Sequence, residues 1–412
     1  MATVRTLFFL GIVFFFCSLI GASRSFEDRR SLLDGGPAVI DVKTFGALAD
    51  DKTDNVVAFT AAWIEACKNS TTPATLLFPE GIFRTGQISF AGPCTSPSPI
   101  TVEVIGTIKA TEMSEYVSPD WITFFQVDNM VLKGSGVFDG QGALSWPLND
   151  CKQNKGKCVS LPDSLKFDKV NNSVVSDITS LNSMGFHYHL HRCSNVTFTN
   201  LTITAPGDSP NTDGMHISSS NLISVTDSVI GTGDDCISIG HTTSNITITG
   251  ITCGPGHGIS VGSLGKRREE KTVDGVFVRN CSFTNTTNGA RIKTWLGLEP
   301  AEAKNIIYEN LIMNAVQNPI VIDQSYGKKA RVASTSVWKI SDVHFRNISG
   351  TSVSNIPVSL QCSTRNPCEN IEVADVDLSY VGRPHNTTFV SDCANAKAIF
   401  GGKLNPPACT LV

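Results

Sequence analysis

Residues 194–203 read SNVTFTNLTI, and the same Ser-Asn opening with β-branched residues returns in SNLISVTDSVI at 220–230 and SNITITGITC at 244–253. The three Ser-Asn steps lie 26 and 24 residues apart, and related openings begin at Asn305 (NIIYENLIM) and Asn370 (NIEVADVDL). A period in the twenties with several short strands in each repeat is typical of a solenoid. Such runs, separated by Gly, Asn, Asp and Ser, continue from about Ile100 to Leu378.

Other repeat architectures fit these runs less well. Helical repeats need long stretches of period 3.6, leucine-rich repeats need a fixed leucine pattern, and a propeller repeat is nearer about 40 residues. We therefore predict an all-β fold: a single-domain, right-handed parallel β-helix over residues 39–412. Inward side chains of neighbouring coils are expected to form ladders of like residues.

The open N-terminal end of a solenoid needs a cover. Residues 54–67 predict a short capping helix, with Thr53 or Asp54 as its cap. Its apolar residues recur at helical spacing and are expected to share the buried face: Val56, Val57, Phe59, Trp63 and Ala66.

The first residues predict export from the cell. Arg5 precedes an apolar run over residues 7–20 and then small residues, which is typical of a signal peptide covering residues 1–23. The run is shorter than the roughly 20 residues that cross a bilayer, and no later stretch is long and apolar enough to span one. Residues 24–38 are charged and Gly-rich, and we expect them to be flexible. The protein is thus predicted to be secreted and extracellular.

Export makes the cysteines interpretable as disulfides. Close spacing predicts the pairs Cys151–Cys158, Cys236–Cys253, Cys362–Cys368, Cys393–Cys409 and Cys67–Cys94. A metal site is the alternative, which the lack of CxxC spacing disfavours. Several N-x-[ST] sequons are also expected to be glycosylated, among Asn69, Asn171, Asn195, Asn200, Asn245, Asn280, Asn285, Asn347 and Asn386.

Composition limits the partners. The chain is 41% hydrophobic and 17% charged, which supports a packed core. Its formal net charge of −4 gives no global attraction to a polyanion, so any electrostatic steering must be local. We expect no nucleic-acid partner, no membrane association and a monomeric chain.

Three short motifs share one spacing. Asp213 in NTDG, Asp235 in GDD and His257 in GHG are each 22 residues apart, and each motif enters a similar strand (GMHIS, CISIG, GISVG). They are therefore expected on one face of adjacent coils, roughly 4.8 Å apart per coil. Arg291 follows His257 after 34 residues; we assign the 12 extra residues to a projecting loop, so that Arg291 and Lys293 continue the stack.

Carboxylates placed so close together repel one another. At least one of Asp213, Asp234 and Asp235 is expected to have a raised pKa and to hold a proton. Glycosidic cleavage needs this arrangement, because one carboxyl protonates the leaving oxygen while another activates water. Calcium binding is the alternative, but it favours more oxygen ligands and no adjacent cations. Singly, each Asp-Gly or Asn-Gly pair is an ordinary turn.

Two further groups are candidates of lesser weight. His187, His189 and His191 alternate in FHYHLHR and are expected to share a polar sheet face, with a metal triad as the alternative. The charged run from Lys266 to Lys271 is expected to be a solvated loop that could guide a polyanion.

Together these motifs closely resemble glycoside hydrolase family 28, the polygalacturonases, and the pattern is most similar to plant, pollen-type exopolygalacturonases. The likeness covers nearly the whole mature chain, from VKTFGALADDKTDNVVAFTAAWIEAC through FDGQG, ITAPGDSPNTDGMHIS, TGDDCISIG, CGPGHGISVGSLG and NGARIKTW. The resemblance implies an inverting enzyme that cleaves α-1,4-galacturonosidic bonds of polygalacturonate, the acidic chain of pectin, and needs no cofactor or metal.

The resemblance also implies roles for the catalytic residues. Asp234 would be the general acid, and Asp213 and Asp235 would activate water. His257 would hold the acid in its protonation state and orientation. Carboxylates about 4.8 Å apart look closer to the separation of retaining enzymes, roughly 5–5.5 Å; the resemblance nevertheless implies inversion.

For substrate binding, the resemblance assigns Arg291 and Lys293 to galacturonate carboxylates. Tyr326, in IDQSY, matches a family tyrosine at the cleavage subsites. Gly327 stands where the plant pattern usually has cysteine, which predicts that one disulfide is missing. The alternatives are an endo-acting polygalacturonase, a calcium-dependent pectate lyase, a rhamnogalacturonan hydrolase and a non-catalytic wall glycoprotein.

Overall fold

The computed structural model describes residues 36–112, 116–149, 161–327, 335–385 and 387–410. The predicted signal peptide, the Cys151–Cys158 pair and the sequon at Asn386 lie outside these ranges. Residues from Ala38 onward form one compact unit. Its first strand begins at Ala38, which pairs with Ala74. Ala38 is the last residue of the segment 24–38 that was predicted to be flexible.

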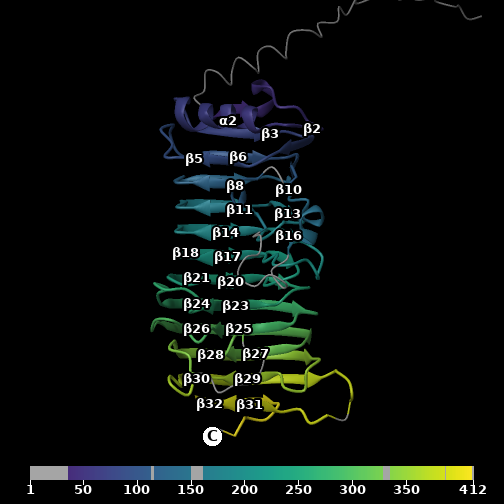
Figure 1. Cartoon of the computed structure of the whole chain (residues 1–412), viewed down its shortest axis with the longest axis vertical. Helices are drawn as coiled ribbons and strands as arrows, with labels where there is room; N and C mark the ends of the chain where they lie inside the picture. Colours follow the sequence, from purple (N-terminus) through teal and green to yellow (C-terminus); the bar gives the residue numbers. More distant parts are fainter. Residues whose placement is uncertain (1–35, 113–115, 150–160, 328–334, 386, 411–412) are drawn as a thin grey trace, which may run out of the picture. The chain divides into compact units, whose positions relative to one another are not determined.

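One sheet contains eleven parallel strands, which neighbour each other in chain order (Figure 1). They are β5 (Ile88–Ala91), β8 (Asp120–Phe125), β11 (Asp163–Asp168), β14 (Tyr188–His191), β17 (Met215–Ser218), β20 (Ile237–Ile239), β23 (Ile259–Leu264), β25 (Asn288–Thr294), β27 (Asn318–Asp323), β29 (Val358–Gln361) and β31 (Ser391–Ala394). Each coil of the chain thus adds one strand to this sheet.

The other 21 strands form a second hydrogen-bonded sheet. One column holds β1 (Ala38–Asp41), β3 (Ala74–Phe78), β6 (Ile100–Val104), β9 (Met130–Lys133), β12 (Asn171–Ser176), β15 (Ser194–Thr199), β18 (Asn221–Thr226) and β21 (Thr243–Thr249). The next holds β2 (Asp50–Asp54), β4 (Ile82–Thr85), β7 (Thr107–Ala110), β10 (Val137–Asp139), β13 (Thr179–Leu181), β16 (Thr202–Thr204), β19 (Val229–Gly231) and β22 (Thr252–Cys253).

The two columns merge in the later coils. Both β21 and β22 pair with one long strand, β24 (Val273–Thr284). It is followed in the sheet by β26 (Glu302–Val316), β28 (Lys339–Ser352), β30 (Cys368–Tyr380) and β32 (Ala396–Asn405). All of these pairings are parallel, which confirms the predicted parallel β-helix.

The repeats seen in the sequence are the coils themselves. SNVTFTNLTI forms β15 and β16, and SNITITGITC forms β21 and β22. In two of the three Ser-Asn steps the asparagine, Asn195 or Asn245, has φ of 55°; in the middle step Leu222, the residue after Asn221, has this conformation instead. Asparagine tolerates this left-handed conformation better than most residues, which explains why it recurs at the turn into each strand.

Aromatic and aliphatic ladders fill the interior of the coils. The rings of Phe90, Phe124 and Phe167, on β5, β8 and β11, follow one another with centroids 5.3 Å apart at each step. On later coils the equivalent inward positions carry aliphatic residues, such as Ile217 and Ile239. Like residues stack because strand pairing without a shift brings the same position of every coil together.

The predicted capping helix is present, but it begins and ends two residues later than expected. Helix α2 spans Val56–Ile64 at the end of the coils (Figure 1), and a π-helical turn (Glu65–Asn69) continues it. Phe59 packs against Phe78 with ring centroids 4.8 Å apart. The N-cap residue is Asn55, not Thr53 or Asp54. Asp54 instead accepts hydrogen bonds from Val56 N, at 3.1 Å, and Gly86 N, at 3.0 Å.

One residue assigned to the buried face of this helix was predicted wrongly. Val57 is 82% exposed, whereas Phe59, Trp63 and Ala66 are buried. Val57 follows Val56 by one position, which turns it about 100° around the helix and away from the coils. Among the described residues, the other short helices are 3₁₀ turns at Val42–Phe45, Gly142–Leu144 and Trp146–Leu148. No helix of the described ranges is long and apolar enough to cross a membrane.

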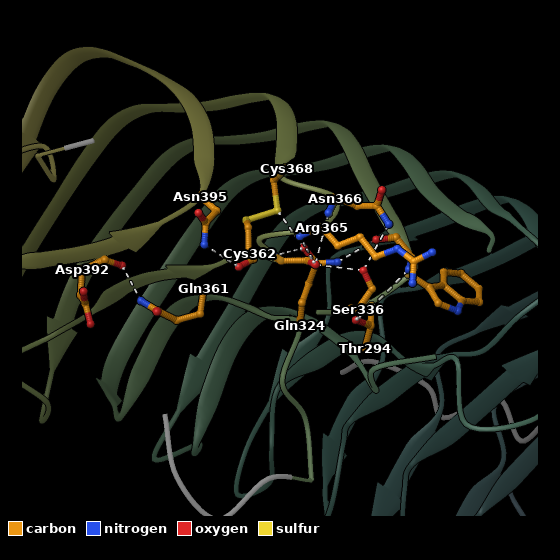
Figure 2. The surroundings of a disulfide bond; sticks show 12 residues. Thr294, Gln324, Ser336, Gln361, Cys362, Arg365, Asn366, Cys368, Asp392 and Asn395 are labelled. Atoms are coloured by element: carbon orange, nitrogen blue, oxygen red, sulfur yellow. Dashed lines mark hydrogen bonds between the residues drawn. A yellow bond between two sulfur atoms is a disulfide. The ribbon is translucent and has the colours of Figure 1, made fainter. Parts of the chain in front are cut away.

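Four of the predicted disulfides are present: Cys67–Cys94, Cys236–Cys253, Cys362–Cys368 and Cys393–Cys409. Figure 2 shows the polar side chains around Cys362–Cys368, which tie successive coils together. Gln324 donates to Trp338 O at 2.9 Å and accepts from Ser363 N at 2.8 Å. The described residues also include two free, buried cysteines, Cys193 and Cys281.

Candidate active site

Strand pairing places the three motif residues at one corner of adjacent coils. Met215, Ile237 and Ile259 are direct neighbours across β17, β20 and β23, with an offset of 22 residues at each step. Asp213 and Asp235, two positions earlier, are linked through a hydrogen bond from Gly214 N to Asp235 O. The predicted stack of Asp213, Asp235 and His257 is therefore confirmed by the register.

The register predicted for Arg291 was wrong. Arg291 pairs with Ser260, not His257, because the offset from β23 to β25 is 31 residues. The loop between the two coils therefore adds nine residues instead of 12, which shifts Arg291 three positions along the sheet. Arg291 and Lys293 lie on the strand itself, next to the carboxylates.

Asp235 is a buried carboxylate surrounded by donors. Its Oδ1 accepts from Arg291 Nη2 at 2.5 Å and from Ser260 Oγ at 2.9 Å, and its Oδ2 accepts from Lys293 Nζ at 2.7 Å. Burial alone would favour the neutral acid, but Lys293 and Arg291 hold the pKa of Asp235 below its ordinary value. Asp235 is thus ionised, and both cations predicted to bind substrate also form ion pairs with it.

Asp213 has the opposite environment. Its Oδ2 accepts a 2.7 Å hydrogen bond from Ser238 Oγ, and Ser238 in turn lies 2.8 Å from His216 Nδ1. Burial, with a smaller contribution from nearby cations, lowers the pKa of His216 to about 3, so the ring is neutral. Burial and the charges of Asp234 and Asp235 raise the pKa of Asp213 well above the ordinary value.

Asp234 faces the solvent beside His257. Its side chain is 26% exposed, against 1% for Asp235. Asp234 Oδ1 lies 3.0 Å from His257 Nδ1 and accepts a hydrogen bond from Asp235 N at 2.8 Å. A ligand can thus reach the carboxyl of Asp234 more easily than that of Asp235. A backbone N–H and an imidazole hold the carboxyl of Asp234 in place.

A cleft of about 530 Å³ lies over these residues. Its lining includes the three aspartates, Lys293 and Tyr326, together with the side chains of Lys166, Phe186, His189, His191, His216, Ser238, Lys266, Arg267, Glu270 and Trp295. Lys293 Nζ stands 5.2 Å from the centroid of the Tyr326 ring. All the predicted site residues except His257 and Arg291 thus line the cleft, and those two contact Asp234 and Asp235.

Comparison with known proteins places the chain in a family. Residues 67–402 match the family model of the glycosyl hydrolases family 28. An exopolygalacturonase of Arabidopsis thaliana is 44% identical over 415 residues, which cover 98% of this chain and 96% of that protein. This chain belongs to glycosyl hydrolase family 28. A polygalacturonase of Nicotiana tabacum is 45% identical over 375 residues, covering 90% of this chain and 92% of the relative.

Solved structures share the fold of this family 28 hydrolase. An exopolygalacturonase from Thermotoga maritima has a TM-score of 0.69 at 20% identity, covering 89% of this chain and 91% of its own. An endo-xylogalacturonan hydrolase from Aspergillus tubingensis has a TM-score of 0.72 at 23% identity, covering 89% and 100%. At such low identity these likenesses concern the β-helix alone.

Two serines and a histidine of the family 28 site were not predicted. His216, Ser238 and Ser260 occupy the same position on β17, β20 and β23, next to Arg291 on β25. The sequence held a signal for them, because each lies three residues after Asp213, Asp235 or His257. Residues at equal distances from in-register residues must themselves be in register.

The prediction for the three alternating histidines was partly wrong. His189 and His191 line the cleft as a polar face, but His187 is fully buried before β14 begins. Its Nδ1 lies 2.8 Å from Ser180 Oγ, and burial lowers its pKa to about 3. The three residues therefore form neither one face nor a metal triad.

A metal ion fits poorly between the carboxylates of this family 28 hydrolase. Asp234, Asp235 and His257 offer ligand atoms within 4.8 Å of one another. However, both oxygens of Asp235 already accept hydrogen bonds from Arg291 and Lys293. Ca²⁺ takes six to eight oxygen ligands, and here it would be placed beside two side-chain cations.

Proposed function

We propose that this family 28 hydrolase cleaves α-1,4-galacturonosidic bonds of polygalacturonate, with inversion and from a chain end. The observation that carries the proposal is the difference between neighbouring carboxyls: Asp235 is held ionised by two cations, while Asp213, on the adjacent coil, favours its proton. The two plant relatives are named as an exopolygalacturonase and a polygalacturonase, which supports this substrate and, for one of them, this mode of attack.

The proposed mechanism assigns one task to each carboxyl. Asp234 donates a proton to the oxygen that leaves the scissile bond, and His257 keeps it oriented. Water attacks the anomeric carbon from the opposite face, and the ionised Asp235 accepts its proton. Asp213, which keeps its own proton, helps to activate the water only through a hydrogen bond to it. A later exchange with solvent returns both carboxyls to their starting states.

The anionic substrate would be recognised beside the carboxylates. Lys293 and Arg291 each have donor hydrogens beyond those used for Asp235, so each can also bind a substrate carboxylate. Tyr326 lies against Lys293 and would form the wall of the same subsite. We further propose that the protein is secreted after removal of a signal peptide over residues 1–23, and that it acts as a monomer in the cell wall or apoplast.

One time course on unesterified polygalacturonate tests the proposal. Monomer as the sole early product would support exo action, whereas a ladder of oligomers would show endo action. NMR of the fresh product should show the β-anomer from the α-linked substrate; initial α-anomer would contradict inversion. Absorbing, unsaturated products would indicate a lyase, and turnover only on rhamnogalacturonan would identify a different substrate.

Asp234→Asn gives this experiment its catalytic test. Turnover should fall by at least about 10²-fold, the usual contribution of a positioned acid, with an unchanged circular dichroism spectrum. Asp227→Asn is a matched control, since Asp227 lies exposed on the turn between β18 and β19. Near-normal turnover of Asp234→Asn would remove this residue from the mechanism.

A further inference from the structure

The charged loop that follows β23 contains one acid that does not face the solvent. Residues 266–269 are exposed, as expected for a solvated loop. Glu270, in contrast, is only 8% exposed. A carboxylate loses its hydration when it is buried, so its burial is unfavourable unless protein donors replace the water. The proposed mechanism gives Glu270 no task, and its burial therefore points to a different role.

Both oxygens of the Glu270 carboxylate accept hydrogen bonds from the loop itself. Oε2 accepts from Gly265 N at 2.5 Å, and Oε1 accepts from Arg267 N at 2.7 Å. Hydrogen bonds to an ionised acceptor are shorter and stronger than those between neutral groups. Glu270 thus binds the backbone on either side of Lys266 and closes residues 265–270 into one turn.

The two ends of this turn are fixed to the coils. Gly265 has a φ of 82°, and a Cβ atom there would lie 2.6 Å from Trp338 Nε1, so the backbone packs directly on this buried indole. At the other end, Lys271 N donates to Thr242 Oγ1 at 3.3 Å, and Lys271 O accepts from Thr242 N at 3.0 Å. Between these two anchors, the backbone of the turn is held by Glu270.

The turn carries two cations that line the cleft. Lys266 and Arg267 both belong to its lining, and Lys266 Nζ lies 5.4 Å from the centroid of the Trp295 ring. Among the described residues, no carboxylate lies within 4.0 Å of the charged group of either cation. Their charges are therefore available to an anionic polymer, and their positions depend on the backbone that Glu270 holds.

We propose that Glu270 is a positioning residue for hydrolysis of the polymer. Its carboxylate holds the turn so that Lys266 and Arg267 present their charges to the cleft, and it acts through these cations and not by contact with the substrate. This inference rests on the proposed function, because it requires an anionic polymer as substrate. It also implies an effect opposite in sign to simple charge repulsion: an acid in the lining of the cleft strengthens the binding of a polyanion.

Glu270→Gln tests the inference, because the amide keeps the size of the side chain but accepts hydrogen bonds through one oxygen only. One of the two backbone N–H groups then loses its partner. KM for unesterified polygalacturonate should rise by about five-fold, the upper end for an exposed ionic contact, and kcat should change little. A KM that falls or stays the same would show that Glu270 does not position the cations.

Glu269→Gln is the matched control for charge. It removes the same negative charge from the neighbouring position, where the side chain is exposed. If the acids of this loop act only by repelling the polymer, both variants should lower KM. The positioning role instead predicts a higher KM for Glu270→Gln alone, with no increase for Glu269→Gln.

A double-mutant comparison shows whether Glu270 acts through the two cations. Lys266→Ala combined with Arg267→Ala should itself raise KM. Adding Glu270→Gln to this variant should raise KM no further, because the charges that the turn positions are then absent. A further rise as large as in the wild-type background would overturn the inference, since Glu270 would then affect binding by another route.

Hydrogen exchange gives a readout that does not need turnover. Glu270→Gln should speed the exchange of amides in residues 265–270 and leave the exchange of β20 and β23 unchanged. Unchanged exchange in the turn, or faster exchange without a rise in KM, would contradict the positioning role. A wild-type protein that neither binds nor hydrolyses polygalacturonate would instead contradict the proposed function, and faster exchange in the variant would still show that Glu270 holds the turn.

Discussion

Asp213 and Asp235 occupy equivalent positions on adjacent coils, yet they differ in charge state. A serine bonds to each carboxylate, but the neighbours of the two serines differ. Ser260, which bonds to Asp235, lies next to Arg291, whereas Ser238, which bonds to Asp213, lies next to neutral His216. Two direct ion pairs then favour the ionised form of Asp235. The pairing of both cations with Asp235, together with the burial of Asp213 beside two carboxylates, thus decides which carboxyl keeps its proton.

Asp213→Asn should stabilise the fold at neutral pH. Folding raises the pKa of Asp213. The stability that this carboxyl contributes is therefore fully present below the unfolded-state pKa of about 3.8, and it is lost as pH rises through the folded-state pKa. Asparagine stays neutral and avoids this loss. We expect a free energy of unfolding at least about 1 kcal/mol higher than wild type near pH 7, and little difference below pH 3.8. Denaturant titrations at several pH values measure it.

Asp235→Asn is the contrasting variant. Its ionised carboxylate is paired with Arg291 and Lys293, so the substitution leaves two buried cations without their partner. The variant should lose about 3–5 kcal/mol at neutral pH. A stability loss of similar size for Asp213→Asn would show that the two carboxyls are not in opposite charge states.

Among the elements, the middle strands of the eleven-stranded sheet present one face to the core and the other to the site. Alternate residues of β17, β20 and β23 are the buried Ile217, Ile239 and Val261 and, facing outward, His216, Ser238 and Ser260. In the earlier coils the inward face carries aromatic rings instead. Packing inside the coils therefore holds the strands whose outer face forms the site.

Phe124→Ala tests the contribution of the aromatic ladder in β8. Phe124 is 1% exposed and lies between Phe90 and Phe167, so the truncation should cost about 3–5 kcal/mol of unfolding free energy. Phe125, its neighbour, is only partly buried and stacks with Lys169. Phe125→Ala should cost much less, and equal costs from denaturant titration would contradict the inward ladder.

At the scale of the whole molecule, the net charge is negative and does not attract a polyanionic substrate. The chain carries 33 basic and 37 acidic residues, a net charge of −4. The cleft nevertheless includes Lys166, Lys266, Arg267 and Lys293 in its lining. Attraction of polygalacturonate must therefore act over short range, because beyond about 10 Å salt at 0.1 M screens exposed charges.

The Michaelis constant for polygalacturonate should consequently rise with salt. Between about 0.05 and about 0.5 M NaCl we expect KM to increase several-fold, since the attraction between the cleft and the polymer is screened. The turnover number should change little, because the buried pairs at Asp235 are screened much less. Steady-state kinetics measure both, and a fully methyl-esterified polymer is the control. An equal rise of KM for the neutral polymer would show that the attraction is not electrostatic.

The sequence by itself determined the β-helix and the stack of Asp213, Asp235 and His257. Equal spacing of 22 residues is sufficient for this, because parallel coils of equal length bring equivalent residues together. The Ser-Asn repeats, four of the disulfides and the presence of a capping helix were predictable for the same reason: each depends on short spacings along the chain.

Only the tertiary structure decided what surrounds that stack. The length of one loop set Arg291 opposite Ser260, and the geometry across coils made Asp235 the partner of both cations. Packing between the coils also buries His187, and Val57 is left exposed on the capping helix. Spacing specifies which residues share a position on successive coils, but the contacts of a side chain depend on loop lengths and on packing between coils, which no local pattern encodes.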